Sequence, residues 1–142
     1  MSYTTSQHSV NQYKNVDNYT GVVDADPHKL IQMLLDGALG KLSVVKGLME
    51  RNDMAKKGEI IGQVMLIVGG LRSSLDMEAG GDIAVNLDNL YEYIGRRLLE
   101  ANLMNDVGII DEVVSLLREI KTAWDSIPQE SRSQQDVDAV AV

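Results

Sequence analysis

Histidine carries much of the acid–base and metal chemistry that proteins perform near neutral pH, and this chain of 142 residues contains only His8 and His28. None of its eight Glu residues is followed three positions later by His, so the Glu-x-x-His pairs of di-iron helix-bundle enzymes are absent. The chain has no cysteine, which excludes disulfides, thiolate nucleophiles and Cys-ligated zinc. The sequence therefore predicts no metal site and no cofactor.

Other catalytic motifs are also missing. The sequence has no G-x-x-x-x-G-K-S/T phosphate loop, no H-E-x-x-H zinc helix and no G-x-S-x-G nucleophile elbow. Neighbouring acids such as Asp111 and Glu112, or Glu78 and Asp82, are more typical of solvated surface and helix caps than of a general acid and base. We predict a binding protein and not an enzyme.

Charge and hydropathy exclude several classes of binding partner. Lys and Arg number 13 against 21 Asp and Glu, so the net charge of −8 offers no attraction to nucleic acid or to anionic lipid. The longest strongly apolar run, Val64 to Val68, falls far short of the roughly 20 residues that span a membrane. Residues 1–10 are polar and lack the apolar core of a secretory signal. We expect a cytoplasmic protein that neither inserts into membranes nor binds nucleic acid.

Apolar periodicity predicts four helices, over about 27–50, 54–75, 83–103 and 106–127. Asp26 followed by Pro27 is a typical helix start, Asp53 and Asp82 are the expected caps of the second and third helices, and Asn105 and Asp106 are expected to break the chain before the fourth. Residues 76–82, which include Gly80 and Gly81, are expected to form a loop. Pro128 ends the last helix.

Short connections return each helix beside its predecessor, so the predicted fold is all-α, an antiparallel up-and-down four-helix bundle. The bundle domain is expected over residues 26–127. Residues 1–25 show no sustained period and are predicted to be a mobile N-terminal arm, and the polar residues 128–142 are predicted to be a disordered tail.

Two features exceed what a plain bundle requires. The apolar faces of the second and fourth helices are wide, either because a bundle without Phe needs more aliphatic area or because part of the surface is left for another chain. Glycine is also frequent inside the predicted helices, where it marks either close backbone approach or cheap exposed positions. The glycines concerned are Gly37, Gly40, Gly47, Gly58, Gly62, Gly69, Gly70, Gly95 and Gly108.

Several segments together resemble the flagellar secretion chaperone family, FliS. The most specific is GGDIAVNLDNLYEYIGRRLLEAN, from Gly80 to Asn102. Residues 26–31 (DPHKLI), 33–39 (MLLDGAL), 75–78 (LDME) and the pair Ala123-Trp124 agree with the family in order and spacing. The resemblance covers about residues 13–124, and one departure is Leu35, where the family commonly has an aromatic residue.

The resemblance implies a four-helix export chaperone that binds the otherwise disordered C-terminal segment of flagellin. Such a chaperone prevents premature polymerisation in the cytoplasm and aids delivery to the flagellar export gate of the type III apparatus. A flagellar regulator or co-chaperone is a further partner implied by the family. The alternative function is a helical adaptor that sequesters such a regulator through the same grooves.

Candidate flagellin-binding residues follow from the wide helix faces and from a mixed polar and aromatic strip on the third helix. They are Ile60, Val64, Ile67, Val68 and Leu71, then Asn86, Leu90, Tyr93 and Arg97, and finally Ile110, Val114 and Leu117. The alternative for each apolar residue is the bundle core, and for the strip it is a solvated flank. In the arm, Tyr3, Val10, Tyr13, Val16 and Tyr19 are candidate anchors of a self-cap that covers a groove until flagellin displaces it.

Overall fold

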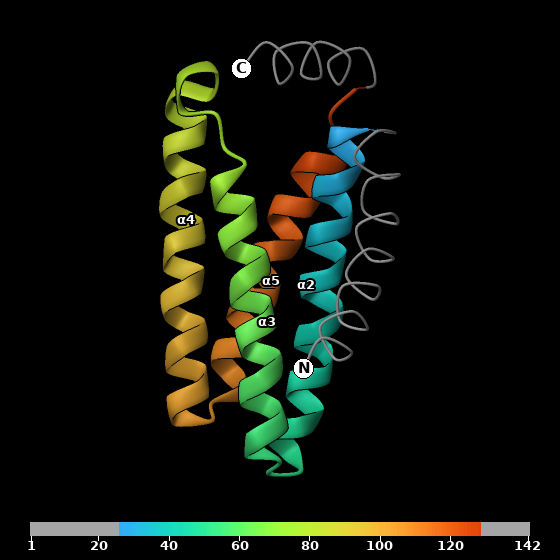
Figure 1. The fold of residues 1–142 in the computed structure, drawn as a ribbon, viewed down its shortest axis with the longest axis vertical. Helices are drawn as coiled ribbons and strands as arrows, with labels where there is room; N and C mark the ends of the chain where they lie inside the picture. Colours follow the sequence, from blue (N-terminus) through green and yellow to red (C-terminus); the bar gives the residue numbers. More distant parts are fainter. Residues whose placement is uncertain (1–25, 129–142) are drawn as a thin grey trace, which may run out of the picture.

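The computed structural model describes residues 26–128, and within that range the chain forms four helices and no strand. They are α2 (Pro27–Glu50), α3 (Met54–Ser73), α4 (Met77–Met104) and α5 (Val107–Asp125), drawn in Figure 1. Each helix packs against the next along the chain, and α5 packs against α2, which closes the ring. The predicted all-α, up-and-down four-helix bundle is confirmed.

An aspartate caps the start of every helix, because its carboxylate accepts hydrogen bonds from amides that have no partner in the first turn. Asp26 accepts from His28 and Asp53 from Lys56, as predicted, and Asp106 accepts from Gly108. The prediction that Asp82 caps the third helix is wrong. That helix begins at Met77, and Asp76 accepts from the amides of Glu78 and Ala79.

The segment predicted as a loop is therefore a helical turn followed by a kink. Gly81 has φ +52° and ψ −131°, a backbone conformation that residues with a side chain rarely adopt. A Cβ at Gly80 would lie 2.6 Å from the Cβ of Ala84, so this position also requires glycine. The two glycines let the chain turn sharply within α4.

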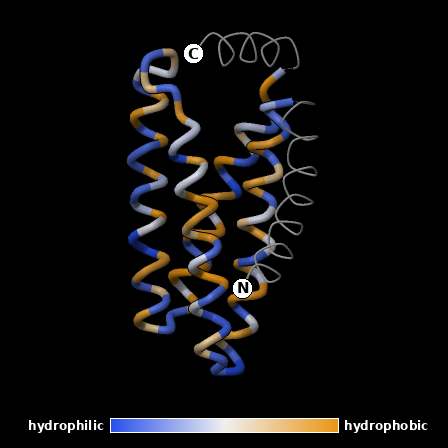
Figure 2. Tube along the Cα trace, in the orientation of Figure 1, coloured by the Kyte–Doolittle hydropathy of each residue, from blue (hydrophilic) through white to orange (hydrophobic). Residues whose placement is uncertain are grey.

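Apolar side chains that recur every three or four residues on all four helices fill the centre of the bundle. Figure 2 shows these apolar residues recurring along each helix. The largest fully buried side chains are Leu35, Leu42, Val45, Ile61, Val64, Leu71, Ile94, Leu98, Ile110, Val113 and Leu117. The chain has no Phe, so aliphatic side chains make up nearly all of this core.

A buried lysine closes the end of the bundle near the α2–α3 and α4–α5 connections. Lys57 is 3% exposed, and its ammonium donates to the backbone oxygen of Asn102 at 2.9 Å and to the side chain of Asn105 at 3.3 Å. Asn105 has a left-handed backbone, φ 52°, which ends α4. A cation at a helix C-terminus is favoured by the helix dipole, so Lys57 ties the start of α3 to the end of α4.

The predicted mobile arm, residues 1–25, and most of the predicted disordered tail, residues 128–142, lie outside the described residues. Pro128 is the last residue that the structure describes. The self-cap candidates Tyr3, Val10, Tyr13, Val16 and Tyr19 lie in the arm, so their role stays a prediction.

Candidate partner-binding surface

The two ends of the bundle differ in how completely their apolar side chains are buried. At the end where α4 meets α5 through Asp106, most interior residues are buried and only Ile60 and Val107 are half-buried; the buried ones are Val45, Leu48, Met49, Ile61, Leu98, Ala101, Ile109 and Ile110. At the opposite end more of the apolar side chains are half-buried, beside the buried Leu35, Leu71 and Ala84. We call the half-buried ones the open-end cluster: Ile31, Leu34, Leu75, Leu87, Leu90, Leu116, Ile120 and Trp124.

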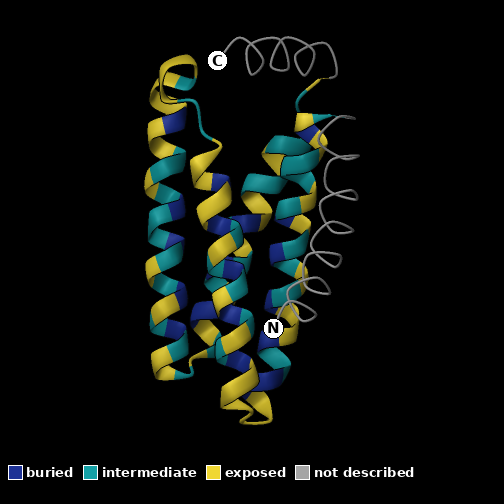
Figure 3. Ribbon diagram, viewed as in Figure 1, coloured by how far each residue is buried: buried dark blue, intermediate teal, exposed yellow. Residues whose placement is uncertain are grey.

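The open-end cluster draws on α2, α4 and α5, and Leu75 adds a side chain from the connection between α3 and α4. In Figure 3 the upper parts of α2 and α5 carry mostly intermediate and exposed positions, whereas buried positions are more frequent lower in the bundle. Beside it, Ile83 next to the α4 kink is 72% exposed. Half-covered aliphatic surface gains free energy when another chain removes it from water.

His28 and Trp124 border the open-end cluster and join α2 to α5. Their rings are stacked, with centroids 4.7 Å apart and planes at 11°, and the indole N–H of Trp124 donates to the backbone oxygen of His28 at 2.9 Å. Asp125 accepts hydrogen bonds from Lys121 at 2.6 Å and from Gln32 at 2.7 Å. The hydrogen bond from Lys121, and next that from Gln32, lower the pKa of Asp125.

The predicted polar and aromatic strip on α4 faces α5. Arg97 donates to Glu112 at 2.8 Å and to Glu100 at 2.6 Å, and the Tyr93 hydroxyl donates to Glu112 at 3.0 Å. The hydrogen bond from Arg97, followed by that from Tyr93, lowers the pKa of Glu112. Tyr93 and Arg97 are thus engaged between helices, whereas Asn86 is exposed and Leu90 belongs to the open-end cluster.

The other predicted groove residues divide into two groups. Ile60, Ile67 and Val114 are half-buried and leave apolar surface accessible. Five residues lie in the core instead and are at most 3% exposed: Val64, Val68, Leu71, Ile110 and Leu117. In this structure those five side chains do not line an open surface, because the helix faces that carry them point directly at the other helices.

Several exposed apolar residues on the outer helix faces are not among the candidate flagellin-binding residues. They are Met33, Val44, Met54, Leu66, Met77, Ile83, Val85, Leu99, Leu103 and Met104. Leu66 is 78% exposed. Its position outside the apolar stripe of α3 could have identified it from the sequence as an exposed residue. Apolar spacing places Ile83 on the core stripe with Leu87 and Leu90, and this is wrong: Ile83 follows the kink at Gly81 and is 72% exposed.

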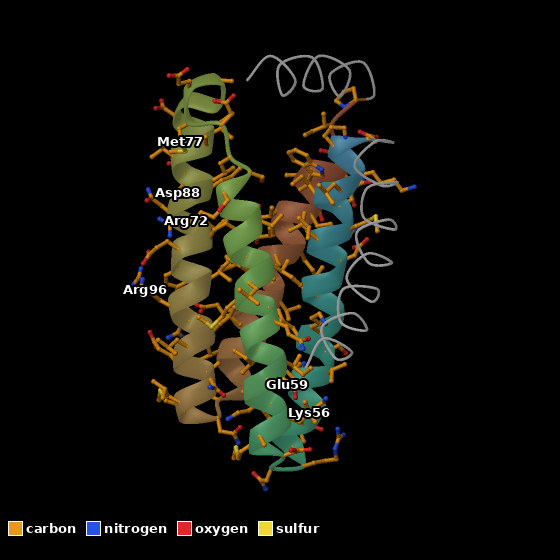
Figure 4. The ribbon with its side chains drawn as sticks, viewed as in Figure 1. Lys56, Glu59, Arg72, Met77, Asp88 and Arg96 are labelled. Carbon is orange, nitrogen blue, oxygen red and sulfur yellow. The ribbon has the colours of Figure 1, made fainter. Side chains whose placement is uncertain are left out.

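Ion pairs join neighbouring helices at the surface of the bundle. Arg72 of α3 pairs with Asp88 of α4 at 2.6 Å, and Figure 4 labels this pair where the two helices meet. Among the described residues, no group of three or more His, Asp or Glu side chains is placed to hold a metal ion. None of the described helices is long and apolar enough to cross a membrane.

The family model for the flagellar protein FliS matches residues 9–131 of this chain, which include all four helices. This chain belongs to the FliS family. It is 49% identical over 119 residues to the flagellar secretion chaperone FliSB of Pseudomonas aeruginosa, covering 84% of this chain and 94% of that one. It is 42% identical over 134 residues to flagellar secretion chaperone FliS of Salmonella typhimurium, covering 94% and 98%.

A third FliS relative, from Vibrio cholerae, is 43% identical over 122 residues, which cover 86% of this chain and 90% of that protein. The predicted family resemblance is confirmed. Leu35, where the FliS family commonly has an aromatic residue, is fully buried in the core. Its difference from the FliS pattern therefore concerns packing between helices and not an open pocket.

Glycines of this FliS-family bundle are mostly exposed. A Cβ at Gly40, Gly62, Gly69 or Gly70 would meet nothing within 4 Å, and the two interhelical neighbours found, at Gly37 and Gly58, lie at ordinary contact distances of 3.8–3.9 Å. Helix packing therefore does not require glycine at those four positions. Of the two explanations for glycine inside the helices, close backbone approach therefore does not apply at these four positions, and exposure does.

A furrow runs along the boundary of α2 and α5. It encloses about 710 Å³. We call it the α2–α5 furrow, lined by Leu39, Ser43 and Lys46 of α2 and by Asp111, Val114, Ser115, Arg118, Glu119, Thr122, Ala123 and Ser126 on the α5 side. It contains one of the predicted groove residues, Val114.

Proposed function

We propose that this chain is a cytoplasmic export chaperone that binds the disordered C-terminal segment of flagellin in apolar grooves. The observation that carries the proposal is the open-end cluster: a FliS-family bundle leaves eight apolar side chains, from three helices and the α3–α4 connection, only half-covered. The relatives from Pseudomonas aeruginosa, Vibrio cholerae and Salmonella typhimurium are named flagellar secretion chaperones.

Reversible binding of an unstructured cargo suits such a surface. A flagellin terminus outside the filament exposes apolar stripes, and covering them prevents premature polymerisation. Burying about 1,000 Å² of apolar surface is worth roughly 25 kcal/mol before the cost of ordering the cargo, which offsets most of it. Several shallow contacts also release one by one when the cargo is drawn into the flagellar export gate.

Within this proposal, Leu90 and the exposed Asn86 border the cargo path on α4, and Ile60, Ile67 and Val114 supply further half-buried contacts. Asn86 offers a side-chain amide to the backbone of an extended segment. Tyr93 and Arg97 contribute through the α4–α5 hydrogen bonds that hold Glu112. The core residues Val64, Val68, Leu71, Ile110 and Leu117 support the surface from beneath.

The arm is proposed as a self-cap whose apolar anchors cover a cargo groove in the free chaperone. Deleting residues 2–19 is expected to raise the binding of a dye that reports exposed apolar surface. Unchanged dye binding by the shortened chain would contradict the cap.

The test of the function is co-purification with full-length flagellin and with flagellin that lacks its C-terminal segment. We expect a complex with the full-length protein only. A complex of equal strength with the truncated flagellin would contradict the proposal, and a flagellar regulator that a flagellin peptide cannot displace would indicate a separate surface for that partner.

A further inference from the structure

The α2–α5 furrow combines apolar surface with a cation that makes no ion pair among residues 26–128. Leu39 and Val114 provide aliphatic surface, and Lys46 is paired with Asp111 at 2.7 Å. Arg118 is exposed and makes no ion pair with any residue of the described range. A partner for this furrow should therefore carry a carboxylate next to small apolar side chains.

The position of Arg118 on α5 directs it toward α2. It lies four residues after Val114 and seven after Asp111, so all three share the helix face that borders α2. Glu119, turned by about 100° from Arg118 on the helix, also lines the furrow but makes no ion pair with it.

We propose that residues 136–140 of this chain's own C-terminal tail dock in the α2–α5 furrow. Their sequence is Asp-Val-Asp-Ala-Val. In an extended segment, Val137 and Ala139 point to one side and Asp136 and Asp138 to the other. The apolar side rests on Leu39 and Val114, and one of the two carboxylates accepts hydrogen bonds from Arg118.

Chain length allows this placement. Ser126, which lines the furrow, lies two residues before Pro128, so the tail leaves the bundle at one end of the furrow. From Ser126 back to Val114 the helix extends about 18 Å. The nine residues 129–137 reach up to about 30 Å when extended, which leaves enough chain to reverse direction.

Attachment to the same chain makes a weak contact sufficient. A segment joined to the bundle by a short stretch of chain is present near the furrow at an effective concentration of about millimolar, so the furrow is covered without a high intrinsic affinity. The proposal concerns this furrow and its own tail, and it does not depend on whether flagellin binds the open-end cluster.

Paramagnetic relaxation in the full-length chain tests the contact. Because the protein has no cysteine, Ala141→Cys gives a single site for a nitroxide label. We expect enhanced relaxation at the amides of Lys46, Asp111 and Val114, far from the tail's attachment point, and none at Leu66 on the outer face of α3. Arg118→Glu should lower the enhancement about two- to fivefold, the size expected for one exposed ion pair.

Lys56→Glu is the matched control, because it reverses a positive charge in the same way as Arg118→Glu. Lys56 lies at the end of α3 far from the furrow in Figure 4, so this substitution should leave the relaxation enhancement at the furrow amides unaltered. Adding Asp136→Arg and Asp138→Arg to Arg118→Glu should restore it. The proposal is overturned if the furrow amides show no enhancement, if Arg118→Glu and Lys56→Glu act alike, or if the reversed charges fail to restore the contact.

Other occupants give distinct results, and each would also overturn the proposal. A second copy would produce the enhancement when spin-labelled chain is mixed with separate isotope-labelled chain. The N-terminal arm would produce it from a nitroxide at Tyr13→Cys instead of from the tail.

Discussion

The imidazole of His28 lies stacked on the indole of Trp124, with ring centroids 4.7 Å apart, and so joins the first turn of α2 to the last turn of α5. His28 is 2% exposed, although it stands next to half-covered aliphatic residues. The stack fixes one edge of the open-end cluster and holds the proposed cargo surface in shape.

Replacing His28 with Ala should lower the free energy of unfolding by about 1–3 kcal/mol, because the stack and its buried volume are lost. Trp124 is the single tryptophan, so its fluorescence in a urea titration reports the change directly. Lys29→Ala, at the exposed neighbouring position, is the control. Equal urea midpoints for the two variants would show that the stack contributes nothing to stability.

Acid should weaken the link between α4 and α5. Arg97, and then Tyr93, hold the pKa of Glu112 below its ordinary value of 4.5. A carboxyl whose pKa is lower in the folded chain stabilises the fold above about pH 4.5, and this contribution disappears as the pH falls through the lowered pKa. Glu112→Gln should therefore be less stable than the parent near pH 7, and the difference should shrink on acidification.

Urea titrations between pH 7 and pH 3 measure that difference. Glu119→Gln serves as the comparison, because Glu119 lies on the same helix and has no ion pair within residues 26–128. A gap between parent and Glu112→Gln that stays constant over this pH range would contradict the assigned link.

Lys57 should stabilise the closed end. Lys57→Met keeps much of the side-chain volume but leaves the Asn102 carbonyl and the Asn105 side chain without their donor, which should cost about 1.5–3 kcal/mol. Lys56→Met, one residue earlier and exposed, should change the free energy of unfolding by less than about 0.5 kcal/mol. Chemical denaturation compares the pair, and similar values would contradict the role of Lys57.

The exposed glycines should be replaceable. Gly62→Ala and Gly69→Ala should each stabilise the bundle by roughly 0.5–1 kcal/mol, because a Cβ meets nothing there and alanine favours the helix. Gly81→Ala should destabilise it, since φ is +52°. Thermal unfolding of the three variants measures both effects, and a loss of stability at Gly62 and Gly69 would contradict the open space seen above them.

The helices were predictable from sequence because apolar spacing and aspartate caps are local signals. The start of α4 was not, because Asp76 and Asp82 are both suitable caps and the choice depends on the Gly80–Gly81 kink. Periodicity also placed Val64 and Ile110 on the correct helix face without telling core from groove. That distinction depends on which neighbour covers each residue, and it is a tertiary property.

The cargo surface itself is tested most directly by titrating the full-length chain with flagellin and comparing Ile83→Asp with Leu103→Asp. Both positions lie on α4 and are 72% and 77% exposed, at opposite ends of the bundle. Ile83→Asp should weaken flagellin binding at least about tenfold, because a charge replaces apolar contact beside the open-end cluster. Leu103→Asp should bind like the parent. Equal affinities for the two variants would contradict a cargo site at the open end.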